Sequence, residues 1–303
     1  FMTGHSVQCI LTVYGRLLTD MKLPTDFNLT GKTVVVTGGG GVLCGMFARA
    51  LGSLGASVAV LDLREDAAKL VADDIVRSGG KAKGYSANVL KPDDMKRVRD
   101  EIANDFGTCD LLLNGAGGNN PKGTTTKEYF DLEDLKDSEL VTFFDLDPDG
   151  ISFVFNLNFL GTLIPTQVFA RDMAEKKHGN IINISSMNAF RPLTKIPAYS
   201  GAKAAVSNFT QWLAVHFAGS GIRVNAIAPG FFVTNQNRAL LFDKDGNPTP
   251  RTGKILAATP MNRFGEAEEL NGTLLWLAND EASGFVTGIV VPVDGGFSAY
   301  SGV

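Results

Sequence analysis

Short runs of β-branched and aliphatic residues alternate along the chain with stretches whose apolar positions recur at helical spacing. The first run covers residues 32–38 and precedes a helical stretch from Met46 to Leu54. The second covers residues 57–63 and precedes a helical stretch from Asp66 to Ser78. Short apolar runs separated by amphipathic helices are typical of βαβ units.

Five further apolar runs repeat this arrangement toward the C-terminus. They lie at Ala82–Ala87, Leu111–Leu113, Ile181–Ile184, Arg223–Ile227 and Ile289–Val293. Each is separated from the next by enough residues for a crossover helix, which parallel strands require and which places helices on both faces of the sheet. We therefore predict an α/β fold, a single doubly wound Rossmann-type domain with about seven parallel strands.

The chain contains no linker rich in proline, glycine or serine and no visible repeat, so we expect one domain over residues 21–303. Residues 1–20 are interpreted as a tail or a non-native extension. Two long connections are distinctive: an acidic insertion at about 118–150 with one short helix, and a polar lid at about 231–270. Because ligands of open α/β sheets sit beyond the carboxyl ends of the strands, we expect these connections to border a substrate pocket.

Composition and charge narrow the function classes. The 303 residues are 44% hydrophobic, and 28 basic against 32 acidic side chains give a net charge of −4, without general attraction to nucleic acid or an anionic membrane. Three widely spaced cysteines predict neither a disulfide framework nor a zinc site, and no histidine or carboxylate cluster predicts another metal site. We expect a cytoplasmic protein.

One stretch could be mistaken for a membrane span, because Ile151 to Ala170 contains twenty residues without a charge. Asn156, Asn158, Gln167 and Pro165 lie inside it, and polar amides are costly in lipid unless they are satisfied. A buried helix is therefore favoured over a span.

Four consecutive glycines at 38–41 follow the first predicted strand and precede a helix. Such a loop brings backbone amides to a pyrophosphate at a helix N-terminus, although a sharp turn alone would also use glycine. Asp62 ends the second strand, where a carboxylate accepts both ribose hydroxyls and repels a 2′-phosphate. We predict NAD as cofactor, with Arg64 nearby weakening the exclusion of NADP. The predicted loop contacts are Gly38, Gly40, Gly41, Val42 and Leu43.

A serine, a tyrosine and a lysine form the candidate catalytic group. Tyr199 and Lys203 are four residues apart, hence on one face of a helix, and Ser186 ends the strand before it. An ammonium beside a phenol is expected to lower the pKa of the tyrosine toward neutrality, where the phenol works as a general acid or base.

Together these motifs resemble the short-chain dehydrogenase/reductase family, over approximately Leu29 to Gly296. The resemblance implies that Tyr199 exchanges a proton with the substrate oxygen, which Ser186 polarises. It also implies that Lys203 binds the nicotinamide ribose and that Asn158 holds a water of the proton relay. Further implied cofactor contacts are Asn88, Val89, Asn114, Ala116, Pro229, Gly230, Phe232 and Thr234.

The chain departs from the family pattern at several positions. Val42 and Cys44 stand where the loop pattern has glycine, Asn88 replaces an aspartate, and Gly115 replaces an asparagine. We expect Gly39 to Gly41 to provide a shifted turn and cofactor binding to persist.

The pocket segments are similar to the group of short-chain enzymes described as D-mannonate oxidoreductase or fructuronate reductase. A sugar acid needs a cation for its carboxylate and several partners for its hydroxyls, and an arginine binds a carboxylate bidentately. Arg191 or Arg238 is the predicted anchor, with a solvated or interface role as the alternative for each. The complete predicted substrate set is Asn119, Lys122, Asn188, Arg191, Gln236 and Arg238.

Other functions remain open at this stage. A keto-gluconate, a polyol or a carrier-bound 3-oxoacyl thioester are alternative substrates, although an acidic carrier protein favours a basic docking surface. A non-catalytic dinucleotide sensor would have no need for Asn158, Ser186, Tyr199 and Lys203 together. The family resemblance implies a homotetramer.

Overall fold

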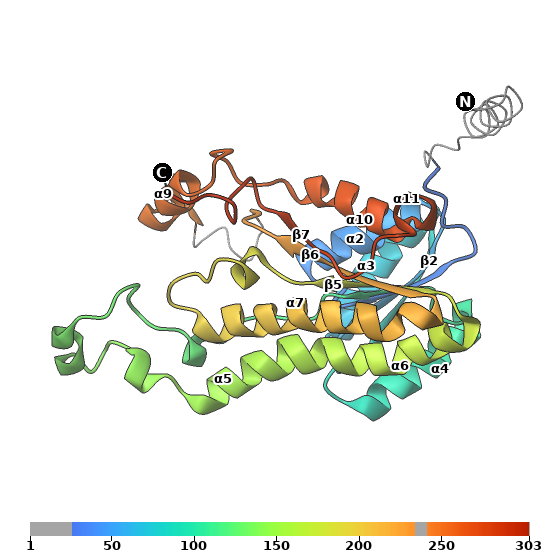
Figure 1. Cartoon of the computed structure of the whole chain (residues 1–303), viewed down its shortest axis with the longest axis horizontal. Coiled ribbons are helices and arrows are strands. Elements are labelled where there is room, and N and C mark those ends of the chain that lie inside the picture. Colours follow the sequence, from blue (N-terminus) through green and yellow to red (C-terminus); the bar gives the residue numbers. More distant parts are fainter. Residues whose placement is uncertain (1–25, 234–240, 303) are drawn as a thin grey trace, which may run out of the picture.

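Seven parallel strands form one sheet in this computed structural model, which describes residues 26–233 and 241–302 (Figure 1). The strand order is β3-β2-β1-β4-β5-β6-β7. The strands are β1 (Thr33–Thr37), β2 (Ser57–Asp62), β3 (Lys81–Ser86), β4 (Leu111–Asn114), β5 (Gly179–Ile184), β6 (Ile222–Pro229) and β7 (Val290–Val293). The predicted α/β fold and its seven parallel strands are confirmed.

Helices cover both faces of the sheet (Figure 1). One face carries α2 (Val42–Ser53), α3 (Glu65–Arg77), α10 (Asn271–Ala278) and the short α11 (Asp280–Ser283). The other carries α4 (Pro92–Phe106), α5 (Pro148–Phe155), α6 (Gly161–Lys176) and α7 (Pro197–Phe217). Single helical turns lie between these elements: the π-helical turn η4 (Asn156–Leu160) and the 3₁₀ turns η5 (Met187–Ala189), η6 (Ala218–Ser220) and η7 (Ala267–Leu270).

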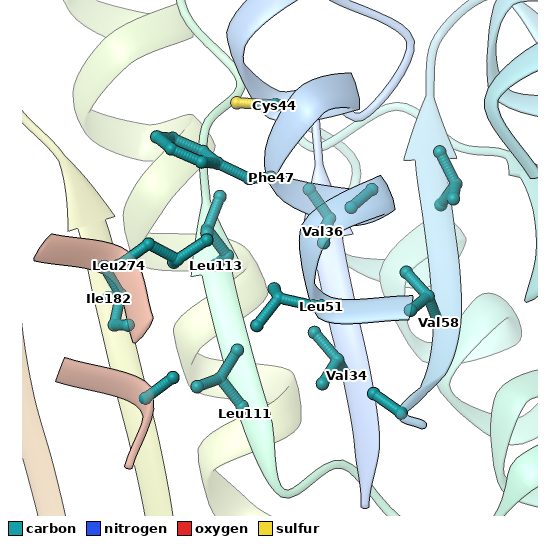
Figure 2. Packing of buried hydrophobic residues seen from close by; sticks show 14 of the residues in the cluster. Val34, Val36, Cys44, Phe47, Leu51, Val58, Leu111, Leu113, Ile182 and Leu274 are labelled. Carbon is teal, nitrogen blue, oxygen red and sulfur yellow. The ribbon is translucent and has the colours of Figure 1, made fainter. Parts of the chain in front are cut away.

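Alternation along each central strand divides the core into two layers. Val34 and Val36 of β1 pack with α2 and α10, whereas Val35 packs with α4 and α6 on the opposite face. Figure 2 shows the first layer, where Phe47 and Leu51 of α2 lie over the central strands. Burial on both faces explains why the central strands β1, β2 and β4 are almost continuously apolar, whereas the edge strand β3 is largely exposed.

The long apolar helix of the sequence is α5 and α6 joined through one turn of π-helix, η4. Among the described residues, the stretch Pro148–Lys176 is the one helix long and apolar enough to cross a membrane, by length and composition only, and half of its apolar window is buried inside the protein. Phe169 and Met173 contribute to the second core layer. The predicted buried helix therefore matches its place in the fold.

Two long connections lie at the same end of the molecule (Figure 1). The insertion between β4 and α5 contains three short 3₁₀ turns, η1 (Pro121–Gly123), η2 (Leu132–Lys136) and η3 (Phe143–Asp145), so the expectation of one short helix is wrong. Its Asp131 and Thr142 each cap such a turn through a side-chain oxygen, which favours short turns over a continuous helix. The described part of the other connection contains α9 (Pro250–Ala257).

Candidate active site

A cavity of about 530 Å³ lies beyond the carboxyl ends of the central strands, where β1 and β4 are neighbours and the strand order reverses. Doubly wound folds bind their ligands at this point. One side of the cavity is lined by the glycine loop and by Asp62 and Arg64 at the end of β2. The remaining lining comes from the ends of β4, β5 and β6 and from α7: residues 115–118, Ile184, residues 230–232, Tyr199 and Lys203.

The glycine loop is built for close approach of the chain. Gly38 has φ +64°, and a β carbon there would lie 2.9 Å from the backbone of Ala116. The amide of Gly41 donates to the carbonyl of Gly38 at 3.0 Å, and Gly41 then directly precedes α2. The shifted turn expected over Gly39 to Gly41 thus reaches the helix, with Val42 as its first residue.

Asp62 closes the side of the cavity near this loop. Its Oδ2 accepts a hydrogen bond from the amide of Gly40 at 3.1 Å, and its Oδ1 accepts from the amide of Arg64 at 3.0 Å. The Arg64 Nε lies 3.9 Å from the same carboxylate, and the Arg64 side chain is largely exposed. The carboxylate is therefore fixed in direction by two backbone amides while it faces the cavity.

Residues after β4 are tied to β1. The hydroxyl of Thr37 accepts from the amides of Gly115 and Ala116, at 3.1 and 3.3 Å. Asn114 lies beneath them, only 2% exposed, and its Nδ2 donates to Thr166 Oγ1 and Asn183 Oδ1. Among the residues predicted to contact the cofactor, Asn114 is therefore a buried link between strands, whereas Ala116 lines the cavity.

Ser186, Tyr199 and Lys203 come together between β5 and α7. Ser185, at the end of β5, hydrogen-bonds to the Lys203 carbonyl and to Ser207, which fixes the helix against the strand. Ser186 follows as the N-cap of η5 and hydrogen-bonds to Tyr199. Tyr199 and Lys203 line the cavity, whereas Ser186 is not among its lining residues.

Lys203 is almost completely buried, and its Nζ donates to the carbonyl of Ile184 at 2.8 Å. Burial lowers the pKa of Lys203 from 10.5 to about 8. The thiol of Cys44 lies in the same surroundings, where burial raises its pKa to about 12 and keeps it neutral. The ammonium therefore has no ionised neighbour in Cys44.

The expected lowering of the pKa of Tyr199 by Lys203 is wrong for the chain alone. The Lys203 Nζ lies 5.7 Å from the centre of the Tyr199 ring, and its hydrogen bond goes to Ile184. Burial raises the pKa of the Tyr199 phenol, while the hydrogen bond with Ser186 acts in the opposite direction. The four-residue spacing places both side chains on one helix face but does not set the direction of the pKa shift.

Asn158 is completely buried in the π-helical turn η4. Its Nδ2 donates to the carbonyls of Gly118 and Val154, at 2.7 and 2.8 Å, and its Oδ1 accepts from the Gly118 amide at 3.3 Å. A β carbon on Gly117 would lie 2.6 Å from Asn158 Oδ1 and 3.2 Å from Lys203 Nζ. Only glycine leaves the space between these two side chains open.

Other predicted positions lie outside the cavity lining. Asn88 accepts from the amide of Leu90, and Val89 packs against Gly161, so both stabilise the turn after β3. Pro229 ends β6, whereas Gly230 and Phe232 line the cavity. The predicted Thr234, Gln236 and Arg238 lie outside the described residues.

The described substrate candidates are dispersed. Lys122 forms an ion pair with Asp147 at 3.1 Å, and Asn119 donates to Thr124 within the insertion. Arg191 is exposed and donates to the carbonyl of Ser298 at 3.2 Å. Asn188 is buried beside Ser186, and its Oδ1 has no hydrogen-bond partner in the described part of the chain.

Sequence reasoning missed several residues of the site. Gly117 and Gly118 line the cavity and hold Asn158, and Phe231 lines it between two predicted residues. Their positions directly after the predicted Ala116 and Gly230 were the available signal. Across residues 26–233 and 241–302, no group of three or more His, Cys, Asp or Glu side chains is placed to hold a metal ion.

Comparison with known proteins places this geometry in a family. The model of the short chain dehydrogenase family matches residues 32–244. An oxidoreductase of Haemophilus influenzae is 62% identical over 93% of this chain and 99% of its own length. A crystal structure named as a candidate D-mannonate oxidoreductase from Haemophilus, with bound NAD, has 61% identity and a TM-score of 0.89 over 93% of this chain and all of its own.

A more distant relative is a 3-oxoacyl-(acyl-carrier-protein) reductase of Escherichia coli, 33% identical over 89% of this chain and 98% of its own length. Similarity therefore extends along nearly the whole described domain and beyond any one substrate. The chain belongs to the short-chain dehydrogenase family of oxidoreductases.

Proposed function

We propose that this oxidoreductase uses NAD(H) to interconvert a ketone and a secondary alcohol on a sugar acid, namely D-fructuronate and D-mannonate. The observation that carries the proposal is the convergence of Tyr199 and Lys203 with Asp62 and the glycine loop on one cavity. A dinucleotide sensor would need Asp62 and the glycine loop but not Tyr199 and Lys203.

The residues present fit a dinucleotide. A β carbon on Gly40 would lie 2.9 Å from Asp62 Oδ2, so the absence of a side chain keeps the space beside this carboxylate open. Asp62 can accept both hydroxyls of an adenosine ribose, and the helix N-terminus after Gly41 favours the pyrophosphate. NAD supplies the acceptor or donor of hydride when it is bound.

The side chains of the catalytic group then have separable tasks. Tyr199 exchanges a proton with the substrate oxygen. Ser186, which hydrogen-bonds to Tyr199, orients that oxygen. Lys203 keeps donors in addition to the one used for Ile184, and these can hold the ribose hydroxyls of the cofactor. Asn158 Oδ1 and Lys203 Nζ both lie next to Gly117, so Asn158 is the residue we assign to the proton relay beside Lys203.

A sugar acid is favoured by two observations. The highly similar crystal structure carries the name of a D-mannonate oxidoreductase. Asn188 offers a buried carbonyl oxygen without a partner among the described residues, directly beside Ser186, and such an atom gains most from a substrate hydroxyl.

We also propose a homotetramer in the cytoplasm. Helix α5 exposes Phe153 and helix α7 exposes Trp212 and Val215, and large exposed apolar side chains are available for contacts between subunits. The described cysteines, Cys44 and Cys109, are free, which is consistent with a reducing compartment. Light scattering tests the tetramer, and a monomeric mass would contradict it.

A substrate panel tests the proposed function. Oxidation of NADH is followed with D-fructuronate, 5-keto-D-gluconate and an acetoacetyl thioester at equal concentrations. We expect the highest kcat/KM with D-fructuronate. No turnover with either sugar acid, together with turnover of the thioester, would overturn the proposed substrate class.

A further inference from the structure

A second cavity, of about 120 Å³, adjoins the active site on the side of the insertion. It is bordered by five segments that lie far apart in the sequence: the insertion, the loop after η5, the segment after β6, helix α9 and the C-terminal segment. Their lining residues are Glu128, Leu193, Thr194, Phe231, Arg251, Lys254, Ile255, Ala258 and Phe297. Phe231 also lines the cofactor cavity, so the two spaces share one lining residue.

Helix α9 turns one face toward this cavity. Arg251, Lys254, Ile255 and Ala258 follow the spacing of residues on one side of a helix, and all four line it. Ile255 is buried and fixes the helix, while the two cations lie nearer solvent. The position of Arg251 is therefore set by the packing of the helix.

Charge in this region is unbalanced. Lys254 Nζ forms an ion pair with Glu128 Oε2 at 2.7 Å, which joins α9 to the insertion. The hydrogen bond from Lys254 holds the pKa of Glu128 below its usual range, and the positive charges of Lys195 and Arg251 act in the same direction. Three cations thus surround one anion, and Lys254 already holds that anion.

Of the two cations that remain, Arg251 lines the cavity and Lys195 does not, so Arg251 is the one placed for a ligand there. Within residues 26–233 and 241–302 its side chain, which is partly buried, forms no ion pair or hydrogen bond. The sequence-predicted Lys122 is paired with Asp147, and the predicted Arg191 donates to Ser298. A guanidinium binds a carboxylate through two parallel hydrogen bonds.

We propose that this second cavity is the subsite for the carboxylate of the substrate and that Arg251 is its anchor, a position the sequence did not indicate. The inference rests on the proposed sugar-acid function and specifies it. The carbonyl or carbinol that reacts lies at Tyr199, and the charged end of the same molecule lies past Phe231 beside α9. Glu128 neutralises Lys254, so Arg251 is the lining cation that remains to pair with a carboxylate.

The test separates charge from shape. D-gluconate and D-sorbitol have the same carbon chain, but sorbitol carries a hydroxymethyl group where gluconate carries the carboxylate. Binding of each to the complex with NADH is measured by calorimetry for the parent protein, Arg251→Gln, Arg251→Lys and Lys254→Gln. We expect Arg251→Gln to weaken gluconate binding about 10- to 100-fold and to leave sorbitol binding unchanged.

The two matched variants test the assignment to Arg251. Arg251→Lys keeps the charge and should recover part of the gluconate affinity, whereas Lys254→Gln removes a cation that Glu128 already holds and should change it less than Arg251→Gln. Equal losses for gluconate and sorbitol in Arg251→Gln, or a larger loss in Lys254→Gln, would overturn the subsite. Thermal unfolding of each variant verifies that the fold is intact.

The outcome remains distinguishable from failure of the proposed function. Turnover of D-fructuronate with an unchanged KM in Arg251→Gln would refute the subsite and leave the proposed function standing. Arg251-dependent binding of gluconate without turnover of any sugar acid would refute the proposed function and leave the subsite standing. A parent protein that binds neither gluconate nor D-fructuronate would refute both.

Discussion

The sulfur of Cys44 occupies the space that a side chain at position 115 would need. A β carbon on Gly115 would lie 2.1 Å from Cys44 Sγ and 3.4 Å from Cys44 Cβ. The family pattern has glycine at the position of Cys44 and asparagine at the position of Gly115. The two departures are therefore one exchange, in which the side chain comes from α2 instead of the loop after β4. Figure 2 shows Cys44 at the end of the core cluster, beyond Phe47.

Gly115→Ala should lower the free energy of unfolding by about 1–3 kcal/mol, because the added methyl group overlaps the Cys44 sulfur. It should also weaken NADH binding, since the loop after β4 lines the cofactor cavity. Cys44→Ala in the same chain should recover most of both losses. Denaturant unfolding and NADH titration of both single variants and the double variant measure the coupling. Purely additive effects would contradict the exchange.

Tyr199→Phe should reduce kcat by at least about 10²-fold, because the variant cannot exchange a proton with the substrate. NADH binding should change less than threefold, since Lys203 keeps its hydrogen bond to Ile184. Tyr300→Phe, at an exposed position, is the control. Stopped-flow turnover and NADH fluorescence measure the two quantities separately. A Tyr199→Phe enzyme with normal kcat would remove Tyr199 from the mechanism.

The contribution of Lys203 to the stability of the cofactor-free protein should rise with pH between about 8 and 10.5. The pKa of Lys203 falls from 10.5 to about 8 in the folded state, so in this window the unfolded chain binds the additional proton. Raising the pH favours loss of the proton from Lys203, which the folded state releases more readily, so the free energy of unfolding increases. Below pH 8 Lys203 is protonated in both states, and its contribution no longer changes with pH. Unfolding of the parent and Lys203→Met at several pH values isolates this contribution as their difference. A difference that does not change from pH 8 to 10 would contradict the lowered pKa.

Asp62→Asn should lower the affinity for NADH by roughly tenfold and improve the use of NADPH. Asparagine can keep only one of the two hydrogen bonds from the amides of Gly40 and Arg64, because its Nδ2 donates and does not accept, and it loses the charge proposed to bind ribose hydroxyls and repel a 2′-phosphate. Arg64 then becomes available to the phosphate. The ratio of kcat/KM for the two cofactors measures the change, with the exposed Asp66→Asn as control. An unchanged ratio would show that another residue selects the cofactor.

The sequence predicted the fold because its signals are local and repeated. Each buried strand is a continuous apolar run, and each crossover is long enough for a helix, so seven parallel strands follow without knowledge of their order. The insertion was less predictable: one short helix was expected there, whereas the structure has three 3₁₀ turns, two of them capped by Asp131 and Thr142.

The candidate site was predictable only where a residue acts through its own chemical type. Tyr199, Lys203 and Asp62 carry functional groups at motif positions, and all three line the cavity. Asn88 and Asn114 have the same polar character, yet their side chains stabilise turns and strands instead. Which amide faces a ligand depends on the neighbours that take up its hydrogen bonds.

By itself the sequence determined the parallel sheet and the glycine loop and pointed to the candidate catalytic group, since periodicity and motif spacing are properties of short segments. Only the tertiary structure decided that Cys44 and Gly115 are complementary, that burial raises the pKa of Tyr199 and lowers that of Lys203, and that Arg251 lies beside Phe231. Steric overlap, desolvation and unbalanced charge arise between segments far apart in the chain, and these exist only once the chain has folded.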